Sequence, residues 1–298
     1  MKKSPRMSRL VEQLFIRWYG LPVSPTHYYC PMPDLATIKA RSTRWLREYD
    51  FSTVELDPKE RSALFQRLAQ YRDELPGLPP FAEVSSQGFG PGYGEVESQV
   101  LYEMLRLYKP AWVVEVGSGV STVYSIAALR ANRDRDNLSA KLLCIEPHPT
   151  PPLEQLSECG FVALRVEEVQ ETPLAVFEAL GPGDVLFIDS THTGKIDSDV
   201  YRLYLEILPR LSRGVVIHSH DILFPYLTLH EGHPLFDLSL LWNESALVKA
   251  LLTHNSHFRV LMCQSYLHFK DPDSLREVAP LYDPVRHMPA SLWLEKVE

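Results

Sequence analysis

The stretch VVEVGSGVST, residues 113–122, decides the fold, because a short apolar run leads directly into two glycines separated by a serine. An apolar run of this kind is typical of a buried parallel strand, and the glycines allow a tight turn into a following helix. Such a turn, at the carboxyl end of a strand, is where open α/β sheets bind their ligands. A dinucleotide fingerprint has a third glycine, but Thr122 occupies that position. The turn therefore predicts a ligand site and disfavours a nicotinamide cofactor.

The chain after residue 95 alternates between strand and helix patterns. Strands are expected over residues 112–116, 141–146, 162–166, 184–189 and 214–220. Helices are expected over residues 98–107, 121–132, 153–159, 173–180 and 195–211. Strands separated by helices imply βαβ units and a parallel sheet covered on both faces. The expected fold class is therefore α/β with a Rossmann-like core.

The chain before residue 95 has a different character. Residues 7–18 carry apolar side chains at helical spacing, and residues 57–75 read as a second helix with Asp57 as its N-cap. Proline and glycine are frequent between these segments and the core. We expect a helical, proline- and glycine-rich cap over residues 1–94 and an α/β catalytic domain over residues 95–298. The amphipathic segment 7–18 also makes a homodimer reasonable.

The composition limits the classes of partner. The 298 residues carry a net charge of −8, so the surface should repel nucleic acid. No apolar run approaches the roughly 18 residues that a membrane span requires. The four cysteines are scattered and form no CxxC pair, which fits a reducing cytoplasm. The sequence thus favours a cytoplasmic protein that acts on a small molecule.

The glycine turn resembles motif I of the class I S-adenosylmethionine-dependent methyltransferases, in which an acidic residue, here Glu115, precedes a GxG turn. The second expected strand ends in CIEPHP, and the resemblance places Glu146 where that family binds both ribose hydroxyls. The later VEEVQETP matches the segment that lies against the adenine, and Tyr93 falls in a glycine-rich segment that related enzymes fold over the cofactor. The resemblance therefore implies a seven-stranded core and S-adenosylmethionine as cofactor, held by Glu115, Gly117, Ser118, Gly119, Ser121, Glu146, Glu168, Val169 and Tyr93.

Ionisable side chains follow the fourth and fifth expected strands, in FIDSTH and HSHDI. Asp189 and Asp221 stand at carboxyl ends on the same sheet edge as the glycine turn, and His192 and His220 accompany them. The period of two along a strand puts His218 and His220 on one face. We expect His218 to be a buried core histidine.

These two segments resemble the methyltransferase group that includes macrocin O-methyltransferase and the cephalosporin hydroxylase-like enzymes. In that group an Asp after the fourth strand and an acidic pair after the fifth bind Mg²⁺, which implies a metal site at Asp189, His220 and Asp221. His220 departs from the pattern, because it replaces an acidic residue. Imidazole suits Zn²⁺, Fe²⁺ or Mn²⁺ better than Mg²⁺. Either the metal differs or none is bound, and a neutral histidine then serves as general base.

The predicted function is S-adenosylmethionine-dependent methyl transfer to a hydroxyl or amine of a small molecule, such as a sugar or natural-product scaffold. The predicted catalytic residues are Asp189, His192, His220 and Asp221. An alternative is a non-haem iron oxygenase, in which Asp189, His220 and one further histidine form a two-histidine, one-carboxylate centre. A third possibility keeps the fold without catalysis, as a binding subunit.

Overall fold

The computed structural model describes residues 14, 17–18, 34–54, 56, 58–90, 92–230 and 241–298. Contacts divide the chain into two compact units, residues 1–47 with 237–240 and residues 48–236 with 241–298. In the first unit, α2 (Leu35–Ala40) begins after Asp34, whose carboxylate accepts a hydrogen bond from the Thr37 N–H. A 3-10 turn, η1 (Ser42–Arg44), follows it, and the Trp45 indole donates back to the Ile38 carbonyl.

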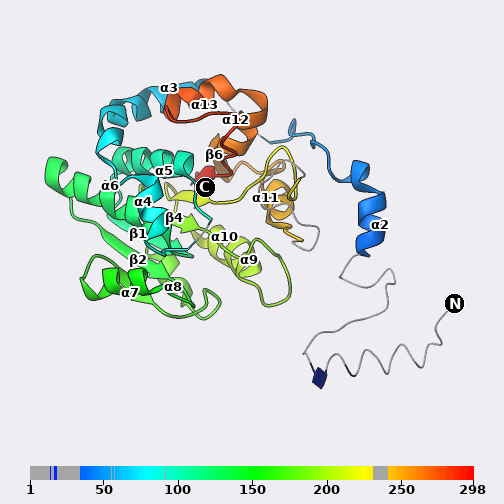
Figure 1. The fold of residues 1–298 in the computed structure, drawn as a ribbon, viewed down its shortest axis with the longest axis horizontal. Coiled ribbons are helices and arrows are strands. Elements are labelled where there is room, and N and C mark those ends of the chain that lie inside the picture. The colour runs from blue at the N-terminus through cyan, green and yellow to red at the C-terminus, as the bar shows by residue number, and fades with distance from the viewer. Residues whose placement is uncertain are drawn as a thin grey trace. The chain divides into compact units, whose positions relative to one another are not determined.

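The second unit is built on a sheet, in which the described residues form seven strands in the order β3-β2-β1-β4-β5-β7-β6 (Figure 1). The strands are β1 (Trp112–Val116), β2 (Lys141–Ile145), β3 (Ala163–Arg165), β4 (Val185–Ile188), β5 (Val216–Ser219), β6 (Phe258–Cys263) and β7 (Leu292–Lys296). The first five are parallel, whereas β7 runs antiparallel to both β5 and β6. All five expected strands form, and the prediction of a Rossmann-like, seven-stranded core is confirmed.

The helices follow the expected pattern except at two places, residues 195–211 and residues 57–75. The second unit contains α3 (Pro58–Leu68), η2 (Ala69–Gly77), α4 (Phe81–Ser86), α5 (Glu95–Tyr108), α6 (Val120–Asp136), α7 (Pro151–Glu158), α8 (Leu174–Glu178), α9 (Asp199–Tyr201), η3 (Arg202–Ile207), α10 (Leu208–Arg210), α11 (Glu244–Leu252), α12 (Gln264–Lys270) and α13 (Pro272–Val278). The helix expected over residues 195–211 begins later, because Ser198 caps α9 by accepting the Tyr201 N–H, and it passes through a π-helical turn at η3. The helix expected over residues 57–75 ends at Leu68 and continues as the 3-10 helix η2; its predicted cap, Asp57, lies outside the described residues.

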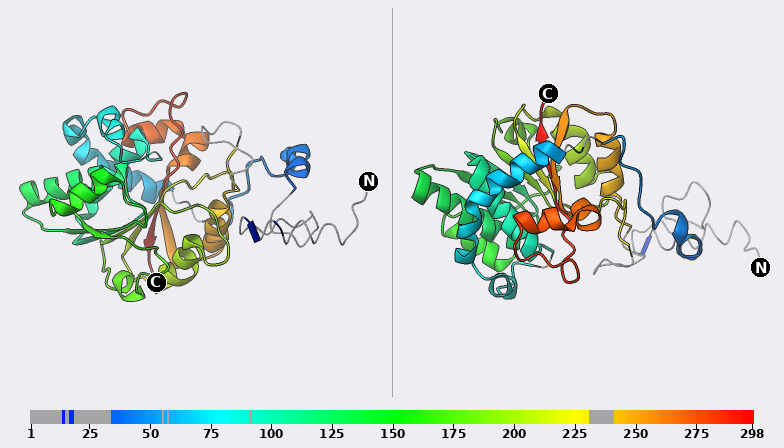
Figure 2. Two further views of the ribbon diagram at one scale, coloured as in Figure 1. Left: turned by 60° about the horizontal axis from the view of Figure 1, so that its bottom comes forward. Right: turned by 90° about the horizontal axis from the view of Figure 1, so that it is seen from above.

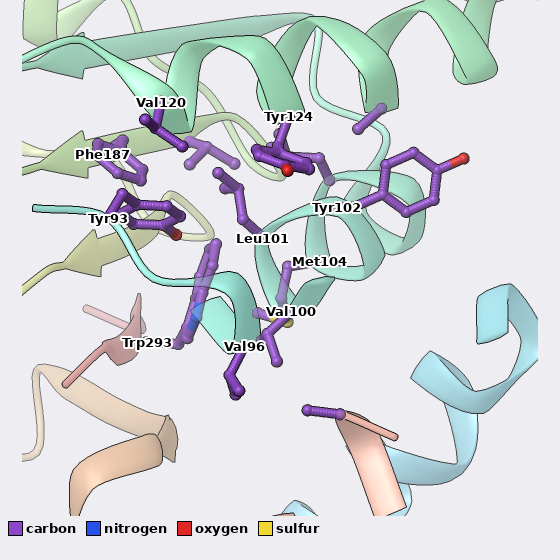
Figure 3. Packing of buried hydrophobic residues seen from close by; sticks show 14 of the residues in the cluster. Tyr93, Val96, Val100, Leu101, Tyr102, Met104, Val120, Tyr124, Phe187 and Trp293 are labelled. Carbon is purple, nitrogen blue, oxygen red and sulfur yellow. The ribbon is translucent and has the colours of Figure 1, made fainter. Parts of the chain in front are cut away.

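Helices lie on both sides of the sheet (Figure 2), and alternate side chains of β1 and β4 enter two separate apolar cores. Val113 and Phe187 belong to the core that contains the side chains of α5 and α6, whereas Val114 and Leu186 belong to the core on the opposite face. Figure 3 shows the first of these cores, in which Tyr93 lies beside Phe187. Because successive side chains of a strand point to opposite faces, each of these buried strands contributes side chains to both cores.

The segment before the core packs within the same unit as the sheet from residue 48 onward. In that segment, α3 and η2 contact α5. The boundary between a cap at residues 1–94 and a catalytic domain at residues 95–298 stays a prediction. The amphipathic segment 7–18 lies largely outside the described residues. In the ranges that are described, no helix combines the length and apolar composition needed to cross a membrane.

Candidate active site

The turn after β1 is tight because the protein's own backbone occupies the space beside both glycines. Gly117 has φ +77°, and a Cβ there would lie 1.9 Å from the carbonyl oxygen of Asp189. A Cβ at Gly119 would lie 2.7 Å from the carbonyl oxygen of Phe89. We expected these glycines to leave room for a ligand; the structure shows that they also leave room for two other segments of the chain. The Gly117 N–H donates to the Ile145 carbonyl, at 3.0 Å, and ties the turn to β2.

Glu146, directly after β2, is held against this turn. One carboxylate oxygen accepts the Ser118 N–H at 3.2 Å, and the other accepts the His148 N–H at 2.8 Å. The side chain is half-buried. Because a carboxylate oxygen accepts more than one hydrogen bond, both oxygens keep capacity for a ligand that donates two.

A cavity of about 180 Å³ joins the glycine turn to the end of β4. Its lining comprises Phe89, Tyr93, Gly117, Ser118, Gly119, Val120, Ser121, Glu146 and Asp189. Six of the predicted cofactor residues and one predicted catalytic residue therefore meet at one cavity. Residues far apart in the sequence converge there because the carboxyl ends of β1, β2 and β4 share one edge of the sheet.

The other three predicted cofactor residues do not line this cavity. Glu115 is fully buried beneath the turn, where it accepts a hydrogen bond from the Ser121 hydroxyl. Burial raises the pKa of the Glu115 carboxyl to about 8. Glu168 is exposed and Val169 is buried in the segment after β3. Their contact with a cofactor stays a prediction.

Four ionisable side chains meet beyond the cavity, and we call Asp189, His192, His220 and Asp221 the Asp–His cluster. His192 Nε2 lies 3.5 Å from Asp189 Oδ1 and 3.4 Å from Asp221 Oδ2. His220 Nδ1 lies 3.4 Å from Asp189 Oδ1 and 3.7 Å from Asp221 Oδ2. All four predicted catalytic residues are thus brought together, and each histidine faces both carboxylates.

Two buried glutamates flank the cluster, and sequence reasoning did not single out either for this role. Glu244, the first residue of α11, places Oε2 2.7 Å from His192 Nδ1. Glu97, in the first turn of α5, places Oε1 4.0 Å from His220 Nε2 and accepts the Ala290 N–H at 3.0 Å. A usable signal was that both glutamates lie in the first turn of a helix, Glu244 directly after Asn243 and Glu97 three residues after Gly94.

The opposite charges in the cluster stabilise one another, which raises the pKa values of both histidines and lowers the pKa of Asp189. Burial lowers the pKa of His192, but hydrogen bonding to Asp189 and Glu244 outweighs it and raises the pKa well above the usual value. Burial likewise opposes protonation of His220, yet Asp221 and Asp189 raise its pKa to about 9. Burial alone would raise the pKa of Asp189, but His220 and His192 hold it well below its usual range.

The backbone around the cluster is constrained. His192 and Asp221 both adopt left-handed conformations, with φ 59° and 55°. Such strain is found at functional sites, where surrounding contacts maintain it. The His192 carbonyl accepts the N–H groups of Asn243 and Glu244, and the Asn243 side chain exchanges two hydrogen bonds with the Gly194 backbone. Asn243 precedes α11 as its N-cap residue, but its side chain holds the β4 loop instead of capping the helix.

His218 is separate from the cluster. It is fully buried, with the rings of Phe187 and Trp293 each centred 4.4 Å from its own ring. Its Nε2 lies 3.4 Å from the Tyr93 hydroxyl. Burial holds the pKa of His218 well below its usual value, so the ring is neutral. His218 is therefore a core histidine, as expected.

A comparison with protein-family models gives a match in the middle of the chain. A family model described as a methyltransferase domain matches residues 114–222, which contain the glycine turn, Glu146 and the whole Asp–His cluster. Residues 114–222 are therefore similar to a methyltransferase domain. No curated protein matches the chain.

Solved structures with a similar arrangement share little sequence. An O-methyltransferase, TomG, from Streptomyces achromogenes, involved in tomaymycin synthesis and solved in complex with SAM, is 14% identical, with 88% of this chain and 96% of that chain covered and a TM-score of 0.45. A methyltransferase from Geobacter sulfurreducens is 15% identical, with 88% and 98% covered and a TM-score of 0.40. At these scores the likeness carries no argument about substrate or mechanism.

Proposed function

We propose that this protein transfers a methyl group from S-adenosylmethionine to a hydroxyl of a small molecule, such as a sugar or natural-product scaffold. The observation that carries this proposal is the cavity, which has Glu146 and the glycine turn along one side and Asp189 of the Asp–His cluster along another. A methyl donor seated on the turn would therefore lie next to ionisable groups able to bind an acceptor. An amine acceptor is the nearest alternative.

In this proposal the turn and Glu146 bind the cofactor. The free acceptor capacity of the Glu146 carboxylate suits the two ribose hydroxyls, and Ser118, Ser121 and Tyr93 line the remaining wall. Glu168 and Val169 are assigned to the adenine side by the resemblance of the sequence. The Glu115 carboxyl, whose pKa is raised to about 8, lies beneath the turn and stabilises it by accepting a hydrogen bond from the Ser121 hydroxyl.

The Asp–His cluster would position the acceptor and receive its proton. The acceptor oxygen bonds to the methyl carbon as the carbon–sulfur bond breaks, S-adenosylhomocysteine leaves, and the hydroxyl proton passes to a carboxylate of the cluster, because the raised pKa values of His192 and His220 favour their protonated forms. Alignment of nucleophile, methyl carbon and sulfur contributes a large part of the catalysis in such a transfer. Asp189 is well placed for acceptor contact, because its side chain is 26% exposed and lines the cavity.

The proposal also includes a divalent metal ion at the Asp–His cluster. The described residues show no assembled metal centre. The proposal of a metal at the predicted ligands Asp189, His220 and Asp221 is supported only by His220 Nδ1, which is buried, has no hydrogen-bond partner and lies near both carboxylates. A bound divalent ion would orient the acceptor hydroxyl and lower its pKa. The methyltransferase match does not favour the iron oxygenase alternative.

The cellular setting and the partners remain predictions. Cys144 and Cys263 are free and buried and Cys159 is free and exposed, which fits the predicted cytoplasmic location. Acidic net charge supports a small-molecule substrate over nucleic acid. A homodimer through the N-terminal segment stays a prediction.

Calorimetric titration with S-adenosylmethionine and S-adenosylhomocysteine tests the proposal. Loss of two charge-assisted hydrogen bonds in Glu146→Ala should weaken both affinities by roughly a hundredfold or more, at about 1.5–3 kcal/mol per bond. The exposed Glu154 of α7 supplies the matched control, and Glu154→Ala should bind normally. His220→Ala should retain cofactor affinity and lose turnover with a panel of sugar and phenolic acceptors. Unchanged affinity in Glu146→Ala would refute the cofactor assignment.

A further inference from the structure

We propose that a second cavity of this protein, near the β3 edge of the sheet, binds a small organic anion with an aromatic body. The cavity has a volume of about 760 Å³ and is lined mainly by β2, β3 and α8, and we call it the β3–α8 groove. Among the described residues, none lines both this groove and the cofactor cavity. Binding in the groove does not depend on the methyl transfer proposed above.

The groove exists because α8 covers the sheet only partly. This helix is five residues long, and Ala175 and the C-cap residue Ala179 both line the groove. Residues four positions apart lie on the same face of a helix, so this face of α8 carries two small side chains. Both alanines are exposed. The space that longer side chains would occupy at these two positions therefore stays open.

The interior of the groove suits an aromatic ring system. Leu143 of β2 and Val176 of α8 line it, and Trp112 and Phe161 contribute aromatic surface. The Phe161 side chain is 45% exposed, so its ring is available to a ligand. Small-molecule sites typically have volumes of roughly 300–1,000 Å³ and linings that are mostly apolar or aromatic. The volume and the lining of the groove match such a site.

The charged side chains of the groove are all basic. Lys141 and Arg165 line it, and no carboxylate among the described residues does. An adjoining cavity of about 200 Å³, which shares Phe161 with the groove, adds Arg130 and Arg133 and again has no acidic residue in the described part of its lining. The chain as a whole carries a net charge of −8, so this basic lining is a local departure. A site of this charge attracts an anion.

Lys141 is the cation best placed to bind the anionic group. Arg165 and Arg133 each pair with an acidic side chain, at 2.9 and 2.7 Å, which neutralises part of their charge. Lys141 forms no ion pair within the described ranges, and its Nζ lies 4.8 Å from the centre of the Trp112 ring. A ligand that stacks in the groove against the indole therefore brings an anionic group close to the Lys141 ammonium.

The experiment is a fluorescence titration of the full-length protein with two aromatic probes. Anilinonaphthalene sulfonate carries an anionic group, and phenylnaphthylamine has the same ring system without it. Lys141→Glu should weaken binding of the sulfonate probe by about tenfold, because the change removes one attraction and adds one repulsion. The neutral probe should bind Lys141→Glu as it binds the wild type. Added salt should likewise weaken binding of the sulfonate probe alone, because it screens exposed charges.

Lys249→Glu is the matched control for the change of charge. Lys249 of α11 also lies over an aromatic ring, with its Nζ 5.2 Å from the centre of the Phe51 ring, but it lines neither of the two cavities. This variant should bind both probes like the wild type.

A filled groove distinguishes this site from the cofactor cavity. Ala179→Trp should abolish binding of both probes, because the new indole occupies the open space, whereas saturating S-adenosylhomocysteine should leave their binding unchanged. Ala175→Trp repeats the test if circular dichroism shows that Ala179→Trp does not fold. Three results would each overturn the proposal: unchanged affinity for the sulfonate probe in Lys141→Glu, retained binding of both probes in a folded tryptophan variant, or complete displacement by S-adenosylhomocysteine. The variants decide the matter whether or not S-adenosylhomocysteine binds, so failure of the groove and failure of the proposed function are distinguishable.

Discussion

Glu103 offers a quantitative test of how the core tolerates an ionisable group. It lies on α5, is fully buried, and neither carboxyl oxygen has a hydrogen-bond partner among the described residues. Burial raises its pKa from 4.5 to about 8, with only a partial opposing effect from the charge of Arg72. Glu103→Gln keeps the shape of the side chain and removes its ionisation.

The sign follows from proton release. Between pH 4.5 and about 8 the unfolded chain loses a proton that folded Glu103 retains, so stability falls as pH rises through this window. Below pH 4.5 both states are protonated and the effect is absent; above about pH 8 it is constant. At about 1.4 kcal/mol per pH unit, the full effect is on the order of 5 kcal/mol.

Urea unfolding of the wild type and Glu103→Gln at several pH values between 4.5 and 8.5 would measure this effect. The difference in unfolding free energy should change steadily in favour of the variant as pH rises, because all other titrations cancel between the two proteins. An exposed control, Glu154→Gln on α7, should give a difference that does not vary with pH. A constant difference for Glu103→Gln as well would refute the reasoning.

The remaining predictions concern the turn and the metal. Gly117→Ala should lower the melting temperature and abolish S-adenosylhomocysteine binding, because the new Cβ would lie 1.9 Å from the Asp189 carbonyl oxygen. Gly90→Ala is the control: at φ +99° with nothing within 4 Å, its new Cβ meets no atom, so it measures the backbone strain alone, about 1–2 kcal/mol. Retained binding in Gly117→Ala would contradict the packing argument. If the proposed divalent metal binds, its removal by a chelator should lower the melting temperature, and the ion at about 100 times its Kd should restore about 2.7 kcal/mol of unfolding free energy. A melting temperature that neither the chelator nor added divalent ions change would contradict the proposed metal site.

The sheet could be predicted from the sequence because its first five strands are short apolar runs. The observed bounds of β1 agree with the expected residues 112–116, and β4 and β5 fall within the expected ranges. The antiparallel pair β6 and β7 and the helices α12 and α13 were not located residue by residue. The pairing of β6 with β7 joins residues 29 to 38 positions apart and places β7 between β5 and the edge strand β6, which local periodicity does not encode.

The site could be predicted only where a residue is marked by its position after a strand. Asp189, His220 and Asp221 were marked in this way, and the structure brings them together with His192. Glu97 and Glu244 lie in the first turns of helices, where acidic residues are common on the surface because they interact favourably with the helix dipole. Only the tertiary packing that buries them reveals their orientation toward the histidines.

Asp189 connects the two halves of the site physically. Its N–H donates to the Val116 carbonyl at 2.8 Å, its carbonyl oxygen fills the space beside Gly117, and its carboxylate faces both His192 and His220. A shift of the glycine turn on cofactor binding must therefore move the same residue whose carboxylate faces the histidines, because a packed interior transmits small displacements. Cofactor affinity and metal affinity should consequently depend on each other, and by linkage each should change the other by the same factor.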